Sequence, residues 1–272
     1  DGINFALPLL PATIDLTLGE LTVTSNIYIA GPGARKLTVQ RSQAAGTSDF
    51  RLFGIQFTGN AAPIPITIRG LSLKNGKTSS DGGAGFVYYQ TTVQISHVAI
   101  TANSATGSGG GIFNAGTLYL TRSLVNSNTA AGLFAGGIVN VGQATSIISN
   151  STLTGNSGAQ GGAMYNGGNL LLVNNTISHN SASSGGSSVK NDAMGTVRAL
   201  NTIIGMDNPA VAASSLSGAF VSLGNNLVTD ARNSTGFING TNNDQVSDNN
   251  AINPRLGDLA DNGGQTDTRA LL

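Results

Sequence analysis

Hydrophobic residues along this chain alternate with polar ones in short runs. "ITIRGLSL" (66 to 73) and "TVQISHVAI" (92 to 100) are examples. Alternation with a period of two predicts β-strands with one buried face. No segment sustains the apolar spacing of three and four residues that is typical of an amphipathic helix. The 38 glycines, together with many Asn, Ser and Thr residues, also disfavour long helices. The pattern therefore predicts an all-β protein.

The strands belong to a repeat that is marked by asparagines. One column of equivalent positions recurs at intervals of 24 to 28 residues and contains Asn103, Asn128, Asn156 and Asn180. A second column recurs at intervals of 25 or 26 residues and contains Asn114, Asn140, Asn166 and Asn191. A fixed period of this length is typical of a solenoid, in which each repeat buries its apolar face only by stacking on its neighbours.

Apolar residues keep fixed places relative to these asparagines. Four columns are expected to point inward, namely Val93, Leu118, Ser146 and Leu170; Ile95, Leu120, Ile148 and Leu172; Ile100, Val125, Leu153 and Ile177; and Ile112, Ile138, Met164 and Val189. Each coil has room for three short strands but none for a helix. We therefore predict a single-stranded, right-handed parallel β-helix of nine or ten coils, each of roughly 25 residues.

The phrases "GGGIFNAG" (109 to 116), "GGIVNVGQ" (136 to 143) and "GGAMYNGG" (161 to 168) then mark one corner that every coil turns. Stacked corner asparagines form amide ladders, and glycine permits the backbone angles of a tight corner. We interpret both residue types as structural, so neither predicts chemistry.

The regularity of the repeat defines the expected domains. Residues 1–228 form the β-helix, with regular coils over about 66–205 and an irregular insertion over 41–65. Residues 229–272 are polar and loop-like, and we predict that they cap the last coil.

Composition narrows the function. Charged residues make up 10% of the chain, and 13 Lys and Arg balance 13 Asp and Glu. A chain without net charge is not expected to bind nucleic acid or an anionic membrane. It contains no cysteine, which excludes disulfides and thiolate metal sites. No apolar run reaches the length of a membrane span, and the first residues lack the features expected of a signal peptide.

Four stretches together resemble a known family. They are "TLGELTVTSNIYIAGPGA" (17 to 34), "ITIRGLSLKNG" (66 to 76), the repeated "GGGIFN" and "GGAMYN" units, and "NPRLGDLADNGGQTDTRALL" (253 to 272). This order resembles bacterial surface and secreted β-helix proteins that carry a choice-of-anchor Q type C-terminal region. A looser similarity is to the repeats of polymorphic outer membrane proteins. The resemblance implies a pectin lyase-like fold and an exported stalk or adhesin at the bacterial surface.

Parallel β-helices also include polysaccharide lyases and glycoside hydrolases, which need clustered carboxylates. Residues 91–191 contain no Asp or Glu. This absence favours a non-enzymatic module, structural or adhesin-like, whose partner is a polysaccharide or a host glycan. The alternative is a polysaccharide-active enzyme, in which Asp15, Asp49, Asp81 or Asp244 lies in a groove beside an Arg or a Lys.

Few residues outside the ladders are candidates for binding. Of the adjacent Tyr88 and Tyr89, one side chain is expected to face outward, where it would stack on a sugar ring. Asp244 and Asp248, in "NNDQVSDNN", are candidate calcium ligands, and no other cofactor is expected. We interpret His97 and His179 as surface residues. The expected assembly is a monomer or a weakly self-associating chain.

Overall fold

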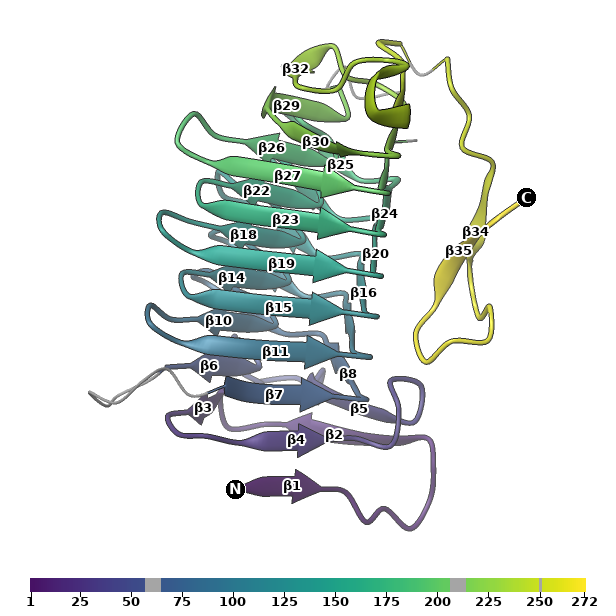
Figure 1. The fold of residues 1–272 in the computed structure, drawn as a ribbon. Helices are drawn as coiled ribbons and strands as arrows, with labels where there is room; N and C mark the ends of the chain where they lie inside the picture. Colours follow the sequence, from purple (N-terminus) through teal and green to yellow (C-terminus); the bar gives the residue numbers. More distant parts are fainter. Residues whose placement is uncertain (57–64, 206–213, 250) are drawn as a thin grey trace.

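The computed structural model describes residues 1–56, 65–205, 214–249 and 251–272, and within them the protein is a rod of stacked β-coils (Figure 1). The first strand lies at one end of the rod, and the chain climbs coil by coil to the other end. The last segment then returns along the side of the rod. The predicted parallel β-solenoid is confirmed, with three long parallel sheets. It makes about eight full turns of about 26 residues, fewer than the nine or ten coils predicted, and nine strands stacked in one sheet enclose eight full turns.

Each coil contributes one strand to each of three long sheets, here called A, B and C. Sheet A contains nine strands, namely β1 (Gly2–Asn4), β4 (Tyr28–Ala30), β7 (Pro65–Arg69), β11 (Thr92–Ser96), β15 (Thr117–Thr121), β19 (Thr145–Ser149), β23 (Asn169–Val173), β27 (Thr196–Leu200) and β30 (Val221–Gly224). Sheet B contains ten, namely β2 (Ala12–Leu16), β5 (Leu37–Arg41), β8 (Ser72–Lys74), β12 (Ala99–Thr101), β16 (Leu124–Asn126), β20 (Thr152–Thr154), β24 (Thr176–Ser178), β28 (Ile203–Gly205), β31 (Leu227–Val228) and β33 (Gln245–Val246).

Sheet C and a short sheet D complete the coils. Sheet C contains nine strands, namely β3 (Leu21–Val23), β6 (Phe53–Ile55), β10 (Gly85–Val87), β14 (Ile112–Asn114), β18 (Ile138–Asn140), β22 (Met164–Asn166), β26 (Val189–Asn191), β29 (Leu216–Ala219) and β32 (Asn233–Thr235). Sheet D contains five strands of two residues, namely β9 (Lys77–Thr78), β13 (Ser104–Ala105), β17 (Thr129–Ala130), β21 (Ser157–Gly158) and β25 (Ser181–Ala182).

The register between coils reproduces the predicted inward columns. Val93 pairs with Leu118, Leu118 with Ser146, and Ser146 with Leu170. These side chains, like those of the other three columns, are buried in the solenoid interior. Ser146 is the one polar residue among them, and its hydroxyl donates to Oδ1 of Asn140 at 2.9 Å. A buried hydroxyl with a partner avoids most of the desolvation penalty.

The two asparagine columns form buried amide ladders. In the first, Asn103 donates from Nδ2 to Oδ1 of Asn128 at 2.9 Å, and the same bond links Asn128 to Asn156 and Asn156 to Asn180. In the second ladder, the equivalent bonds join Asn114, Asn140, Asn166 and Asn191 at 2.7 to 2.8 Å. All eight side chains are buried. The structural interpretation of these columns is confirmed.

Two further columns lie at corners where the backbone adopts positive φ angles. His97 shares the first with Asn150 and Asn174, and φ is 55°, 50° and 56°, respectively. His179, with φ of 57°, shares the second with Ala102 and others. Asn and Gly adopt this left-handed conformation at low cost. His97 is a half-buried corner residue and His179 is an exposed one.

The stretch 41–65 begins at the end of β5, and its residues 53–55 still supply β6 to sheet C. Its residues 57–64 lie outside the described residues. Arg41 is buried and donates to the carbonyls of Thr47 and Ser48, which fixes the loop that follows β5.

The C-terminal segment differs from the predicted cap. Residues 229–249 still contribute β32 and β33 to the sheets, with the short 3-10 helix η1 (Thr241–Asn243) between them. Residues 256–271 form an antiparallel hairpin of β34 (Leu256–Ala260) and β35 (Thr268–Leu271). This hairpin lies along the side of the rod and not on the last coil (Figure 1). An amphipathic hairpin can pack on any sheet face that offers it an apolar surface. Here the surface is on sheet B, where Leu259 packs against Ala34, Ala99 and Leu124.

Candidate functional site

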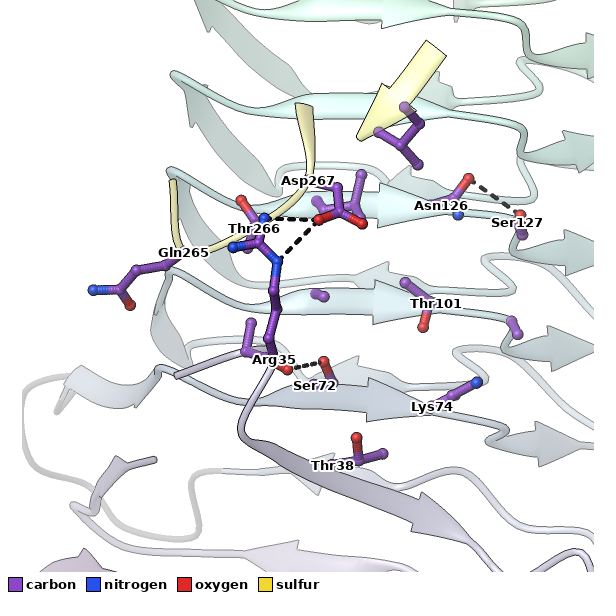
Figure 2. A pocket seen from close by; sticks show the side chains of 15 residues that line it. Arg35, Thr38, Ser72, Lys74, Thr101, Asn126, Ser127, Gln265, Thr266 and Asp267 are labelled. Atoms are coloured by element: carbon purple, nitrogen blue, oxygen red, sulfur yellow. Dashed lines mark hydrogen bonds and ion pairs between the residues drawn. The ribbon is translucent and has the colours of Figure 1, made fainter. Parts of the chain in front are cut away.

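A groove of about 540 Å³ lies between the outer face of sheet B and the hairpin (Figure 2). Its floor comes from strands β5, β8, β12 and β16, which belong to four successive coils. Its wall comes from Leu259 and the loop that joins β34 to β35. The groove therefore exists only because the chain returns along the rod.

The floor is built from two parallel columns of outward-facing side chains. Residues of a strand alternate between the two faces of the sheet, so every second residue of sheet B faces the groove. One column runs from Ser72 through Ala99 to Leu124, and the other contains Lys74, Thr101 and Asn126. The first column is buried against Leu259 at Ala99 and Leu124, whereas the second remains open.

Arg35 fastens the loop over the groove. Its Nε and Nη2 donate to Oδ1 of Asp267 at 3.1 and 2.8 Å, and its Nη1 donates to the carbonyl of Gly264 at 2.6 Å. Asp261 also approaches Nη2, at 2.9 Å. Figure 2 shows the guanidinium of Arg35 beside Asp267, at the mouth of the groove. These groups are partly exposed, so each ion pair contributes at most about 1 kcal/mol.

The chemistry of the groove is that of hydroxyl and amide groups. Thr38, Thr101, Asn126, Ser127 and Gln265 line it, together with the apolar carbons under Leu259. The lining residues include one carboxylate, Asp267, which Arg35 already neutralises, and one further cation, Lys74. A glycosidase needs two facing carboxyl groups. The arrangement can hold a hydroxyl-rich ligand, but the described lining contains no second carboxyl group to face Asp267.

Tyr88 and Tyr89 lie elsewhere, where sheet C turns into sheet A. Tyr88 is half-buried, its ring lies 4.4 Å from that of Phe86, and Nη1 of Arg51 donates to its hydroxyl at 3.4 Å. Tyr89 is 64% exposed, at the tip of the corner turn. Tyr89 thus has the exposure that sugar stacking requires, and sugar binding at this pair stays a prediction.

A third ladder went unnoticed in the sequence because its residue type changes from coil to coil. Backbone N–H groups donate to side-chain oxygens one coil on, and the acceptors are Ser123, Ser151, Asn175, Thr202, Asn226 and Asp244. Only the presence of a short side chain with an acceptor oxygen is constant. The signal is a column of Ser, Thr, Asn and Asp that lies five residues before the first asparagine ladder in the coils that contain both.

Asp244 ends this third ladder and is 2% exposed. Its Oδ1 accepts from the backbone N and from Nδ2 of Asn226, at 2.9 and 3.1 Å. Asp248 is exposed, and its backbone bridges to Asp230. Among the described residues, no group of three or more His, Cys, Asp or Glu side chains is placed to hold a metal. The calcium site at Asp244 and Asp248 stays a prediction, whereas the ladder explains the burial of Asp244.

We expect Asp244→Asn to leave the free energy of unfolding unchanged or to raise it. The amide keeps the acceptor that Asn226 uses and removes a buried charge. Asn175 and Asn226 donate from Nδ2 to the carbonyls of Ile148 and Ala199 in the preceding coil, and we expect the Nδ2 of an asparagine at 244 to donate to a carbonyl of its own preceding coil in the same way. Asp244→Ala should lose about 1 to 3 kcal/mol, because the Asn226 donors are left unpaired. Urea titrations of both variants test this order, and a larger loss for Asp244→Asn would contradict it.

The other three candidate carboxylates lie apart from one another, and each has a hydrogen-bond or ion-pair partner of its own. Asp15 accepts from Nε2 of Gln40 at 2.7 Å, Asp49 pairs with Lys77 at 3.1 Å, and Asp81 accepts from the backbone N of Ser108 at 2.6 Å. None of the three lines the groove under the hairpin. Asp49 does lie beside a lysine, as the enzymatic alternative requires, but both side chains are largely exposed.

Three groups outside the groove have shifted pKa values with structural causes. Burial, and then Arg122, lowers the pKa of His97, while burial, and then Arg269, lowers that of His179. Burial, and then a hydrogen bond to Asp192, raises the pKa of Tyr165 to about 12. Phe134 stacks on Tyr165 with ring centroids 3.9 Å apart, so this tyrosine serves packing.

The described part of the chain contains no helix that is long and apolar enough to cross a membrane. Comparisons with protein-family models, with curated proteins and with solved structures found no match. What the molecule itself shows is its fold class: this chain is a parallel β-solenoid with buried asparagine ladders and a hairpin folded back along one sheet.

Proposed function

We propose that this protein is a non-catalytic, adhesin-like module that binds a polysaccharide in the groove between sheet B and the C-terminal hairpin. The observation that carries the proposal is the lining of that groove, which combines hydroxyl and amide side chains with a short apolar strip. Placement at a bacterial surface, and kinship with the choice-of-anchor Q type proteins, belong to the same proposal and rest on the sequence resemblance alone.

The lining suits sugars because they present hydroxyl groups and apolar C–H faces together. Thr101 and Asn126 pair in register on neighbouring strands, which usually lie about 4.8 Å apart. Donors and acceptors in such a row can pair with successive hydroxyls of a linear chain. Few polar groups fixed on a rigid scaffold are the common basis of ligand specificity.

The charge arrangement favours binding over cleavage. General acid catalysis needs a carboxyl group that is free to give up its proton, and a second one must lie across the scissile bond. Asp267, the carboxylate of the lining, is held by Arg35. We therefore expect the bound polysaccharide to leave the groove unchanged.

A glycan array on the purified protein, with mass spectrometry of the bound glycans, tests the proposal. Thr101→Tyr should fill the groove and weaken binding of the best glycan at least tenfold. Thr117→Tyr makes the same change on the outer face of sheet A and should leave the affinity within about twofold. The proposal would be overturned if the unmodified protein bound no glycan, if the two variants bound with equal affinity, or if cleavage products were released.

A further inference from the structure

The polar column of the groove floor continues beyond the groove. Lys74, Thr101 and Asn126 are followed in register by Thr154 of β20 and Ser178 of β24. All of these side chains face outward from sheet B, because the residue before each of them in β8 to β24 points into the core. The sheet thus presents one row of amide and hydroxyl groups that is longer than the open groove.

The hairpin β34–β35, here called the strap, covers the upper part of this row. Thr154 is 1% exposed and Ser178 is fully buried, although both face outward. Nε of Arg269, on β35, donates to Oγ1 of Thr154 at 3.2 Å. The hydroxyl of Ser178 has no hydrogen-bond partner among the described residues. Burial of a polar group without a hydrogen-bond partner costs free energy. Burial of the Ser178 hydroxyl therefore destabilises the position of the strap seen here relative to one in which the strap has moved away.

The strap is attached in a way that permits it to leave. Within the described part of the chain its two strands pair only with each other, so no described strand of the solenoid sheets loses a neighbour when the strap moves away. Its polar attachments to the described residues of the solenoid include the Arg35 cluster, the Arg269 bond, and a long bond of 3.5 Å from the hydroxyl of Thr266 to the carbonyl of Arg122. Its apolar anchor is Leu259. Segments held by few and largely exposed contacts open at a lower free energy than the core.

We propose that the strap covers a second half of the binding face, and that its release exposes Thr154 and Ser178 as further sites for a linear, neutral oligosaccharide that lies along the solenoid axis. This inference rests on the proposed function of the groove. The extended row spans β8 to β24, which is about 19 Å at the usual strand spacing. A short oligosaccharide fits the open half, whereas a long one binds fully only when the strap has left.

Opening of the strap can be measured without any ligand. The chain has no cysteine, so Ser178→Cys introduces a single thiol beneath the strap. We expect slow labelling of this thiol by a maleimide, and a rate at least tenfold higher when Arg35→Ala is added. Ser146→Cys, inside the solenoid, is the control and should stay protected with or without Arg35→Ala. Asp261→Asn combined with Asp267→Asn removes the acidic partners of Arg35 and should raise the labelling rate of Ser178→Cys to the same extent.

Binding is then measured with soluble linear glucans and xylans as short and long oligomers. Arg35→Ala should tighten binding of the long oligomers several-fold and weaken binding of the short ones, which lose the wall that the strap gives the open groove. Added salt should act in the same direction, because it screens the Arg35 ion pairs. Unchanged labelling of Ser178→Cys, equal labelling of Ser146→Cys, or an equal effect on both lengths would overturn the inference while leaving the groove as a binding site. If neither length binds to any variant, the proposed function fails as well.

Discussion

Asn128→Ala should lower the free energy of unfolding by about 3 to 5 kcal/mol, the first of the two largest effects expected here. Oδ1 of Asn128 accepts from the backbone N and from Nδ2 of Asn103, and its Nδ2 donates to the carbonyl of Ile100. Alanine leaves the backbone N of Asn103 and that carbonyl without these partners in a buried place. Each buried group that loses its partner costs about 1 to 3 kcal/mol. Urea titration followed by circular dichroism measures the loss.

Asn126→Ala is the matched control for this prediction. Asn126 lies two residues earlier on the same coil, faces outward, and accepts a hydrogen bond from the hydroxyl of Ser127. Its replacement removes the same amide from a hydrated place, so we expect a change within about 0.5 kcal/mol. Equal losses for the two variants would show that burial of the ladder adds nothing to its contribution.

Gly136→Ala is expected to destabilise the fold by about 3 kcal/mol or more, at the upper end of the cost of overpacking. A Cβ at this glycine would overlap the carbonyl oxygen of Ser157 in the next coil and lie 2.6 Å from the carbonyl oxygen of Asn128. Both obstacles are backbone atoms, one in the next coil and one in the same coil, and the carbonyl of Ser157 cannot move away without separating stacked strands. The corner glycine of "GGIVN" is therefore required by close approach between coils.

Gly167→Ala, in the related phrase "GGAMYNGG", provides the contrast. Its Cβ would have its nearest neighbours at 3.7 Å, an ordinary contact distance. The substitution should be neutral, or should stabilise by a few tenths of a kcal/mol, because alanine restricts the unfolded chain. Thermal and urea unfolding of the two variants should differ clearly. Comparable destabilisation by both would mean that loss of backbone freedom, and not the clash, explains the first result.

The fold and its ladders could be predicted because their signals repeat. One apolar residue or one asparagine in a column is ambiguous, but four at a fixed interval identify a coil. The third ladder could not be predicted because a backbone N–H can donate to any short side chain that carries an oxygen, so Ser151, Asn175 and Thr202 serve equally as acceptors. The corner role of the two columns that contain His97 and His179 could not be predicted for a similar reason. The residues of each column share a positive φ angle, whereas their side chains differ.

The groove could not be predicted in the same way. It joins residues near Arg35 to residues near Asp267, which are 232 positions apart in the chain. The sequence "NPRLGDLADNGGQTDTRALL" predicts neither the face of the rod on which its hairpin packs nor its distance from the last coil. Arg35, Lys74 and Thr101 each fit an ordinary solvated surface when read alone.

The sequence by itself determined what is periodic: the parallel β-solenoid, its inward columns and its two asparagine ladders, because each coil must repeat the contacts of the coil before it. Only the tertiary structure decided where the unrepeated C-terminal segment lies. Packing of Leu259 on Ala99 and Leu124, and ion pairs at Arg35, place that segment along sheet B. These contacts occur once and have no period, so the groove and its strap follow from the folded chain alone.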